Sequence, residues 1–329
     1  MPRRWMITDR SVEEGELGSS RSRAKDVLTW WVSDGGPVDA LSSWKRVSAS
    51  SFQKALSAAA DELPLILDPA RHEEQKHVGL LVHGYNNDWQ DAARRYEQVA
   101  STLFDGPNGL GLCVLFTWPS NGRPTDYLAD RADARRCAGD LADVLYALYE
   151  WLLGKQQAAA KDPAQACRAK VSVIAHSMGN YLLQNAMHAA WTRANQPLLV
   201  SLVNQCLMVS ADVDNDIFGS GEAQSGGDGE GIANLSYRVT ALYTGRDAVL
   251  GVSAGLKHFG KRRLGRSGLD GSLPKPDNVW QVDCTTLIPD GASSVHSAYF
   301  EAPKVQELLR QVLRGVDRGV LQASGLAPR

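Results

Sequence analysis

A serine at position 177 has the sequence surroundings of a catalytic nucleophile. The apolar run 171–175 leads almost directly into Ser177, and a helical pattern follows at once. A serine on the sharp turn between a buried strand and a helix projects beyond the sheet, where the helix amino terminus favours developing negative charge. Small residues two positions before and after it, Ala175 and Gly179, let strand and helix pass closely, with Ala175 in place of the usual glycine. We therefore predict that Ser177 is the nucleophile of an acyl-transfer site.

A base and an acid are expected downstream of this serine. A serine hydroxyl becomes reactive when a histidine removes its proton, and the resulting imidazolium needs a carboxylate to orient and stabilise it. In this class of sheet the chain order is serine, acid, histidine. His296 follows the last predicted strand and precedes the final helix, a placement that no other of the seven histidines shares. Asp247, in a glycine-containing turn after the strand 237–243, is the predicted acid, and Asp212, after the preceding strand, is the alternative.

The tetrahedral intermediate of such a reaction needs two backbone N–H donors for its oxyanion. Met178, the residue after the nucleophile, supplies one of them. The other is expected in the loop that follows the strand 78–85, where Gly84 lets the backbone approach the substrate and the N–H of Tyr85 is the candidate. His83 is either a structural hydrogen-bonding residue of this loop or a substrate contact.

Further substrate contacts are possible around these residues. His176 and Trp118 are candidates, although the position of His176 beside the nucleophile favours a packing role. A local positive cluster lies downstream, and its members are Lys257, Lys261, Arg262, Arg263 and Arg266. It is either a solvated loop or a receptor for an anionic group such as a phospholipid head group or a carboxylate, with Arg262 and Arg263 in contact.

The pattern of elements that positions these residues is that of an α/β protein. From residue 79 onward, short apolar runs alternate with longer amphipathic ones, which predicts a mostly parallel central sheet with helices on both faces. The predicted strands are 78–85, 112–118, 170–175, 205–210, 237–243 and 279–284. The predicted helices are 88–103, a segment around the apolar stripe 141–152, 178–194 and 302–313.

The domain organisation follows from the same pattern. Residues 75–315 are expected to form the catalytic domain, and residues 1–74 an extension packed on the same sheet. Within that extension, 5–8 and 27–32 are predicted edge strands and 51–63 a predicted helix. Residues 316–329 are expected to be a flexible tail. The segment 219–231 consists mostly of Gly, Ser, Asp and Glu, which indicates a mobile loop or an active-site lid.

Composition narrows the functional class. The chain has 329 residues, 43% of them hydrophobic and 22% charged, which is typical of a globular protein with a sizeable core. A net charge of -2 argues against a nucleic-acid partner. Five cysteines without a C-x-x-C pair indicate a reducing compartment. Because no apolar run has the length of a signal peptide or an integral membrane segment, we expect a cytoplasmic protein.

Neither a metal nor another cofactor is required by the predicted chemistry. The segment 212–216 resembles the start of a calcium loop, but Ile217 and Ala223 stand where that loop needs glycine and glutamate. The segment 255–262 ends on arginine where a phosphate-binding loop needs serine or threonine. We therefore expect no cofactor.

Five segments together resemble the alpha/beta-hydrolase superfamily and, within it, a bacterial lipase-like group of hydrolases of largely unknown function. These segments are 81–86, 116–120, 175–180, 243–250 and 263–265. The resemblance extends over roughly residues 75–305. It implies the alpha/beta-hydrolase fold, a serine nucleophile at Ser177, and hydrolysis of an ester or lipid.

Residues and resemblance together predict a serine hydrolase of esterase or lipase type, acting on a small-molecule ester or lipid through Ser177, His296 and Asp247. A thioesterase or amidase using the same triad is an alternative. A non-catalytic interaction module that retains the fold is another, although such a module has no need of all three residues. The sequence specifies neither the acyl group nor the oligomeric state.

Overall fold

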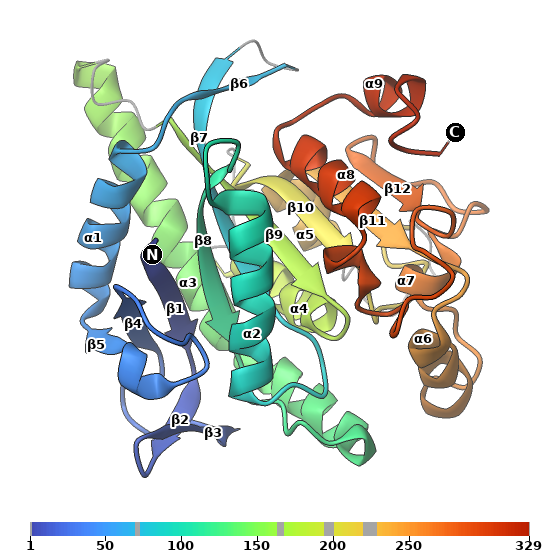
Figure 1. Ribbon diagram of the computed structural model, residues 1–329, viewed down its shortest axis with the longest axis horizontal. Coiled ribbons are helices and arrows are strands. Elements are labelled where there is room, and N and C mark those ends of the chain that lie inside the picture. Colours follow the sequence, from blue (N-terminus) through green and yellow to red (C-terminus); the bar gives the residue numbers. More distant parts are fainter. Residues whose placement is uncertain (1, 70–72, 163–167, 194–200, 220–228, 329) are drawn as a thin grey trace.

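The computed structural model describes residues 2–69, 73–162, 168–193, 201–219 and 229–328, so most of the predicted lid 219–231 lies outside it. A ten-stranded sheet runs in the order β12-β11-β10-β9-β7-β8-β1-β4-β5, with β6 paired to β7 (Figure 1). Its strands are β1 (Arg4–Thr8), β4 (Thr29–Ser33), β5 (Lys45–Val47), β6 (Ile66–Asp68), β7 (Glu73–Val82), β8 (Gly111–Thr117), β9 (Ala169–His176), β10 (Val203–Val209), β11 (Ser236–Tyr243) and β12 (Val279–Asp283). In the part of the sheet that runs from β1 through β8, β7, β9, β10 and β11 to β12, neighbouring strands are parallel. The remaining strands, β4, β5 and β6, pair antiparallel with their neighbours. The predicted, mostly parallel sheet is confirmed.

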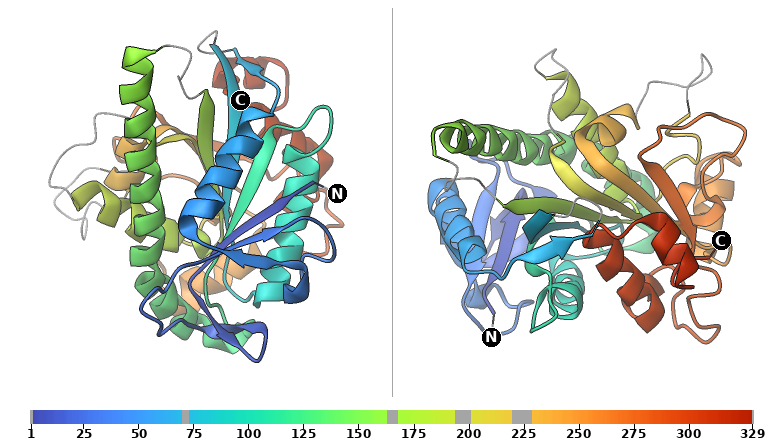
Figure 2. Two further views of the ribbon diagram at one scale, coloured as in Figure 1. Left: turned by 90° about the vertical axis from the view of Figure 1, so that its left-hand side faces the viewer. Right: turned by 90° about the horizontal axis from the view of Figure 1, so that it is seen from above.

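Helices cover both faces of this sheet (Figure 2). One face carries α1 (Ala49–Asp61), α3 (Tyr127–Lys161), α4 (Gly179–Thr192) and α5 (Glu230–Leu235). The other face carries α2 (Trp89–Val99) and α8 (Pro303–Leu313). Shorter elements complete the fold: the hairpin β2 (Arg10–Glu13) and β3 (Glu16–Arg21), and the helices α6 (Ala248–Val252), α7 (Leu264–Ser267) and α9 (Arg318–Ala323). Within the described ranges, no helix combines the length and apolar character needed to cross a membrane.

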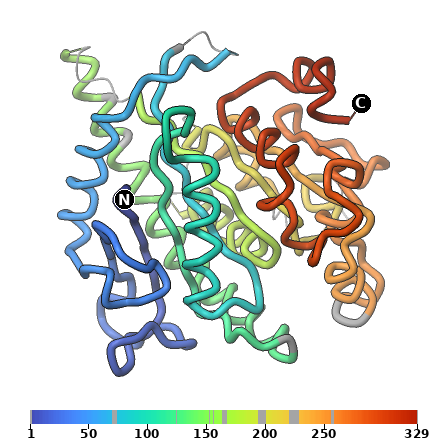
Figure 3. The backbone as a smooth tube through the Cα atoms, in the orientation of Figure 1, coloured from blue at the N-terminus to red at the C-terminus, as the bar shows by residue number. Residues whose placement is uncertain are grey.

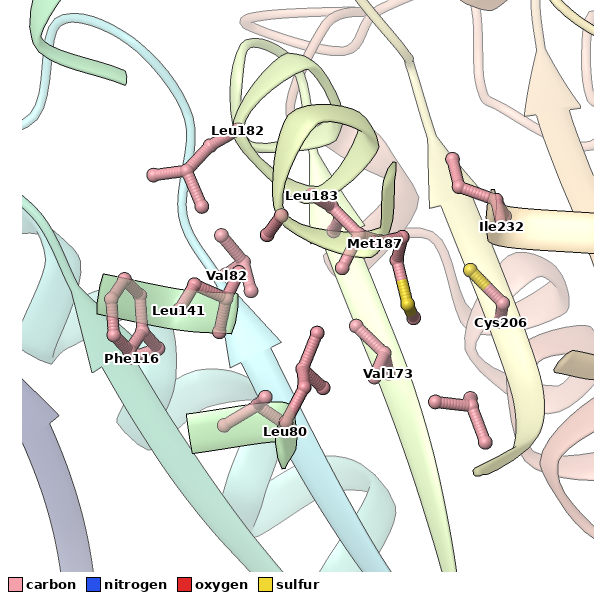
Figure 4. Packing of buried hydrophobic residues seen from close by; sticks show 14 of the residues in the cluster. Leu80, Val82, Phe116, Leu141, Val173, Leu182, Leu183, Met187, Cys206 and Ile232 are labelled. Atoms are coloured by element: carbon pink, nitrogen blue, oxygen red, sulfur yellow. The ribbon is translucent and has the colours of Figure 1, made fainter. Parts of the chain in front are cut away.

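The central strands are apolar because both of their sides are covered. In β7, Leu80 and Val82 face α3 and α4, whereas Leu81 packs on the opposite side with α2. Figure 4 shows the first of these cores, in which Leu182 and Met187 of α4 lie over the sheet. Burial of each such side chain stabilises the fold by about 2 kcal/mol. This double-sided packing explains why these strands are nearly continuous apolar runs instead of alternating ones.

The N-terminal strand occupies a different place from the one predicted. The segment 5–8 was expected at the edge of the sheet, but β1 lies inside it, parallel to β8 and antiparallel to β4. Trp5 and Met6 point to opposite faces and are both buried, so this strand has no solvent-facing side. The predicted edge strand 27–32 corresponds to β4, which is also internal, and the edge is formed by β5, beyond which no further strand pairs among the described residues.

The C-terminal segment 316–329 also differs from the expected flexible tail. Most of it folds into α9 and a following turn, in which the N–H groups of Leu326 and Ala327 both donate to the carbonyl of Leu321. Leu321 and Ala327 are buried in the same core as α8, because the segment folds back beside that helix (Figure 3). These two apolar side chains hold the segment against the core.

Candidate active site

The predicted nucleophile lies on a strained turn between β9 and α4. Ser177 has a φ of 53°, a left-handed backbone conformation that residues other than glycine rarely adopt. Its N–H donates to the carbonyl of Val209 at 3.0 Å, and its carbonyl accepts from the N–H of Asp212 at 3.1 Å. A Cβ at Gly179 would lie only 2.4 Å from the carbonyl oxygen of His83, so a glycine is needed there. The elbow predicted from sequence is thus present and is fixed from both neighbouring strands.

His296 and Asp247 meet at the same edge of the sheet. The Nδ1 atom of His296 lies 2.7 Å from Oδ2 of Asp247, which is buried at the N-cap of α6. The other carboxylate oxygen, Oδ1, accepts from the N–H of Leu250 at 3.0 Å. A carboxylate can only accept, so the imidazole carries its proton on Nδ1, and in the neutral ring Nε2 keeps a lone pair. The histidine is therefore in the tautomer that a general base requires.

The charge of Asp247 is stabilised despite its burial. Burial alone would raise the pKa of this carboxyl, but hydrogen bonds from His296, Ser210 and the N–H of Leu250, together with the charge of His296, outweigh it and lower the pKa below 3.8. The group is therefore an anion near neutral pH. An anion in this position can orient the imidazole and stabilise an imidazolium as it forms.

Ser210 is a member of this cluster that sequence reasoning missed. Its hydroxyl donates to Oδ2 of Asp247 at 2.5 Å and lies 3.0 Å from Nδ1 of His296. Ser210 directly follows β10 and has a left-handed φ of 46°. The sequence feature that could have identified Ser210 is its position, because it is a polar residue at the end of a buried strand, at the sheet edge that carries Ser177. The hydroxyl fixes the carboxylate from a second direction.

His176 supports the backbone of His296. Its Nε2 lies 2.9 Å from the carbonyl oxygen of His296, and its ring packs against that imidazole and against Phe300. Burial, followed by the neighbouring His296 charge, lowers the pKa of His176 to about 3, so the ring is neutral and Nε2–H donates. The packing role favoured by its position agrees with this geometry.

The predicted oxyanion loop packs directly against the nucleophile. A Cβ at Gly84 would lie 2.8 Å from the Cβ of Ser177, so only glycine permits this approach. Tyr85 follows in the same loop, half-buried, with its ring edge-on to Tyr127 at 5.4 Å. Met178 is the N-cap of α4, and the N–H groups at a helix start have no partner within the helix. Both predicted donor segments thus border Ser177.

His83 and Trp118 hold this loop from inside the protein. Nδ1 of His83 donates to the carbonyl of Gly84 at 2.9 Å, and the N–H of Trp118 donates to Nε2 at 3.1 Å. Nε2 also lies 3.0 Å from the hydroxyl of Thr117, which accepts from Nε of the buried Arg10 at 3.0 Å. Burial of both side chains, and the hydrogen bonds that satisfy the ring nitrogens of His83, favour a structural role over substrate contact for these two residues.

Asp212, the alternative acid, belongs to a separate cluster. Its Oδ1 pairs with Nε of Arg263 at 3.0 Å and accepts from the hydroxyl of Ser253 at 2.9 Å, and its Oδ2 accepts from the hydroxyl of Tyr127 at 2.7 Å. That Tyr127 hydroxyl also lies 2.7 Å from Nε2 of His258. We call these five residues the Asp212 network. Its carboxylate is engaged by a fixed cation and two hydroxyls instead of a histidine.

The members of the predicted positive cluster differ in exposure, and the side chain of Lys257 lies outside the described residues. Arg263 is fully buried and pairs with Asp214 at 2.5 Å as well as with Asp212. Lys261 lies 3.3 Å from Asp214, and Arg266 donates to the main-chain carbonyl of Asp247. Arg262 is exposed. The pairing of Arg263 with Asp212 and Asp214 favours a structural role over contact with an anionic substrate.

One buried group of possible metal-binding side chains lies among the described residues, away from Ser177. Atoms of Asp9, Cys137 and Asp140 lie within 4.8 Å of one another. Arg21 binds both carboxylate oxygens of Asp140, at 2.6 and 2.8 Å. Burial, and then the nearby Asp140, raises the pKa of Asp9 to about 8. Charge compensation here comes from arginine.

A family comparison matches most of the region just described. Residues 64–312 match the family described as "Alpha/beta hydrolase of unknown function (DUF900)". The chain belongs to this family. This alpha/beta hydrolase is also 28% identical over 148 residues, 39% of its length, to uncharacterized protein alr1448 of Nostoc sp.. The match spans 35% of that relative.

Solved structures similar to this alpha/beta hydrolase include lipase B of Aspergillus fumigatus, at 15% identity and a TM-score of 0.41, covering 78% of this chain and 57% of that one. Carboxyl esterase 2 of Tuber melanosporum has 9% identity and a TM-score of 0.36, covering 88% and 81%. The esterase of Pyrobaculum calidifontis has 14% identity and a TM-score of 0.32, covering 84% and 93%. At these values the family assignment rests on the family match alone.

Proposed function

We propose that this alpha/beta hydrolase is a serine hydrolase of esterase or lipase type, acting on a carboxylic ester or lipid. The observation that carries the proposal is the hydrogen bond between Asp247 and Nδ1 of His296, at the sheet edge where Ser177 occupies a strained elbow. Strained backbone is tolerated mainly where function requires it. A packing role alone would not need a buried anion, a correctly protonated histidine and a serine on a strained elbow together.

The proposed chemistry has two halves. Oγ of Ser177 attacks the ester carbonyl while its proton passes to Nε2 of His296, and that proton then goes to the alcohol as the C–O bond breaks. In the second half, water attacks the acyl-enzyme, gives a proton to His296, and releases the acid as Ser177 is reprotonated. Asp247 stabilises the imidazolium in both halves. The N–H groups of Met178 and Tyr85 are the proposed donors to the oxyanion.

A neutral His176 supports this assignment. A second cation beside His296 would oppose formation of the imidazolium, and burial keeps His176 uncharged over the pH range in which an esterase works. Its hydrogen bond instead fixes the main chain from which the base projects. The proposed compartment is the cytoplasm, where the buried free thiols of the described cysteines would stay reduced.

The test is Ser177→Ala, assayed on a short-chain aryl ester. Turnover is expected to fall by roughly 10⁴-fold or more, with the fold retained by circular dichroism. Ser253→Ala is the matched control, because it removes another buried hydroxyl at the same edge, one bonded to Asp212. A fluorophosphonate probe should label the parent and the control but not Ser177→Ala. Equal turnover in both variants would contradict the proposal.

A substrate panel then separates the related activities. Aryl esters, thioesters and amides with the same acyl group are compared as kcat/KM. We expect esters to be preferred over amides, because an ester carbonyl is the more reactive one and its alcohol is the better leaving group. A panel in which only thioesters turn over would redefine the substrate and keep the triad. Failure of both turnover and probe labelling would favour a non-catalytic interaction module.

A further inference from the structure

Phe259 is an aromatic side chain held in solvent on a strained turn. It is 98% exposed. The N–H of Lys261 donates to the carbonyl of His258 at 3.0 Å, which closes a four-residue turn whose central residues, Phe259 and Gly260, have φ of 51° and 87°. Two left-handed central residues favour asparagine or glycine at the first of them, not phenylalanine. Strain combined with full exposure indicates a function for the aromatic ring.

Two further apolar side chains accompany this phenylalanine. Val249 and Val252 of α6 are 45% and 54% exposed, and their spacing of three puts them on one side of that helix. The turn is tied back to this region, because the N–H of Gly260 donates to the carbonyl of Ala254 at 2.9 Å. We call Val249, Val252 and Phe259 the apolar tip. It is continuous in sequence with the loop that supplies the proposed acid.

The apolar tip lies at the edge that carries the proposed active site. In Figure 1, α6 projects below the arrowheads of β11 and β12, on the side where the strands end. His258, next to Phe259, has Nε2 2.7 Å from the hydroxyl of Tyr127. The Tyr127 ring in turn contacts Tyr85 of the oxyanion loop. A short chain of contacts thus links the tip to the proposed catalytic serine.

The contact area of the apolar tip indicates what kind of surface it binds. A phenylalanine side chain offers on the order of 200 Å² of contact area, whereas each partner of a standard protein interface buries about 800 Å². The tip is therefore too small for a stable dimer or protein complex. A protruding aromatic ring that follows a short helix with two exposed valines can, however, insert between lipid head groups into the apolar layer beneath.

We propose that the apolar tip inserts into the surface of a lipid aggregate, so that the hydrolase takes its ester substrate from that surface. This inference rests on the proposed function for the substrate, although insertion itself requires no chemistry. Arg262, exposed beside the turn, stands at the height of the head groups in this arrangement. Insertion also accounts for the left-handed backbone of Phe259, because this conformation holds the ring in solvent before the protein meets a lipid surface.

The first experiment measures binding without turnover. The full chain carrying Ser177→Ala is sedimented with phosphatidylcholine vesicles, alone and combined with Phe259→Ser or Val320→Ser. Val320 is the matched control, since it is 58% exposed but lies on α9 at the opposite end of the sheet. Phe259→Ser is expected to lower the partition coefficient roughly tenfold, and Val320→Ser to change it less than twofold. Phe259→Trp should preserve binding, since it keeps an aromatic ring at the tip.

Absence of vesicle binding by the parent, or equal effects of Phe259→Ser and Val320→Ser, would overturn the proposal. So would a dimer, found by size-exclusion chromatography, that Phe259→Ser dissolves without any vesicle binding. The second experiment compares one ester presented in solution and in vesicles. The ratio of vesicle to solution activity should fall for Phe259→Ser and not for Val320→Ser. Inactivity of the parent on both esters would count against the proposed hydrolase, while the binding experiment would still decide insertion.

Discussion

Asp247 and Asp212 are buried aspartates that follow neighbouring strands of one sheet edge, yet their surroundings give them different chemistry. Asp247, after β11, faces a histidine and a serine hydroxyl. Asp212, after β10, faces the fixed guanidinium of Arg263 and the hydroxyls of Tyr127 and Ser253. A carboxylate already neutralised by a buried cation has little charge left to stabilise an imidazolium. The neighbours of each carboxylate, more than its place on the strand, determine its role.

The largest effect expected from this comparison is on turnover. Asp247→Asn keeps the size of the side chain but removes the anion and lets the amide stabilise the wrong tautomer of His296. We expect kcat on a short-chain ester, per folded molecule, to fall by roughly 10⁴-fold. Asp212→Asn is the control, and per folded molecule it should keep most of its kcat. Reversed effects in the two variants would assign the acid to Asp212.

The next effect is on stability, and here Asp212→Asn is the variant expected to show it. Asp212→Asn leaves the buried Arg263 with only part of its compensating charge, and breaking a buried pair in this way costs about 3–5 kcal/mol of unfolding free energy. Urea unfolding measures this loss. The double variant Asp212→Asn/Arg263→Met removes both charges and should recover part of it. An Asp212→Asn variant as stable as the parent would show that the pair is not needed for folding.

Much of the fold and the central residues of the site followed from sequence. Parallel strands bring their carboxyl ends to one edge, so Ser177, Asp247 and His296 were expected together as soon as each was placed after its strand. The order of apolar runs was enough for this step. Their meeting depends on topology, which the alternation of strands and helices specifies.

The supporting residues did not follow from sequence, because their partners are distant along the chain. Nothing near Ser210 indicates that its hydroxyl reaches a carboxylate 37 positions away. Arg263 looked like part of an exposed basic run, and only packing against two aspartates makes it a buried cation. Similarly, Arg10 supports the oxyanion loop through Thr117, a contact across 107 positions. Such contacts depend on side-chain packing, for which one sequence carries no periodic signal.

Ser210 sharpens the comparison on the catalytic side. Ser210→Ala removes one hydrogen bond to the Asp247 carboxylate, and hydrogen bonds to charged groups contribute about 1.5–3 kcal/mol. If this contribution acts in the transition state, kcat falls by roughly 10- to 100-fold. Ser210→Thr, which keeps the hydroxyl, should retain more activity than Ser210→Ala. Unchanged kcat in the alanine variant would restrict Ser210 to a packing role.

The same variant predicts a shift in acid stability. The pKa of Asp247 is lower in the folded state than its ordinary value of 3.8, so its contribution to stability is complete above that value and is lost as the pH falls through the lower folded pKa. Ser210→Ala removes one cause of the lowering, so the loss should be smaller and should be complete at a higher pH. Unfolding free energies measured across the acidic range compare the two proteins. Superimposable curves would show that the hydroxyl does not stabilise the charge.

The smallest effect tests whether the two clusters are independent. Tyr127→Phe removes a hydroxyl that bonds to Asp212 and His258, and it should lower the unfolding free energy by about 1 kcal/mol. Because Arg263 still compensates Asp212, kcat per folded molecule should stay within about twofold of the parent. A fall in kcat as large as that of Ser210→Ala would contradict this. It would mean that the Asp212 network acts on the reaction through the Tyr127 contact with the oxyanion loop, and the separation of the two aspartates by role would fail.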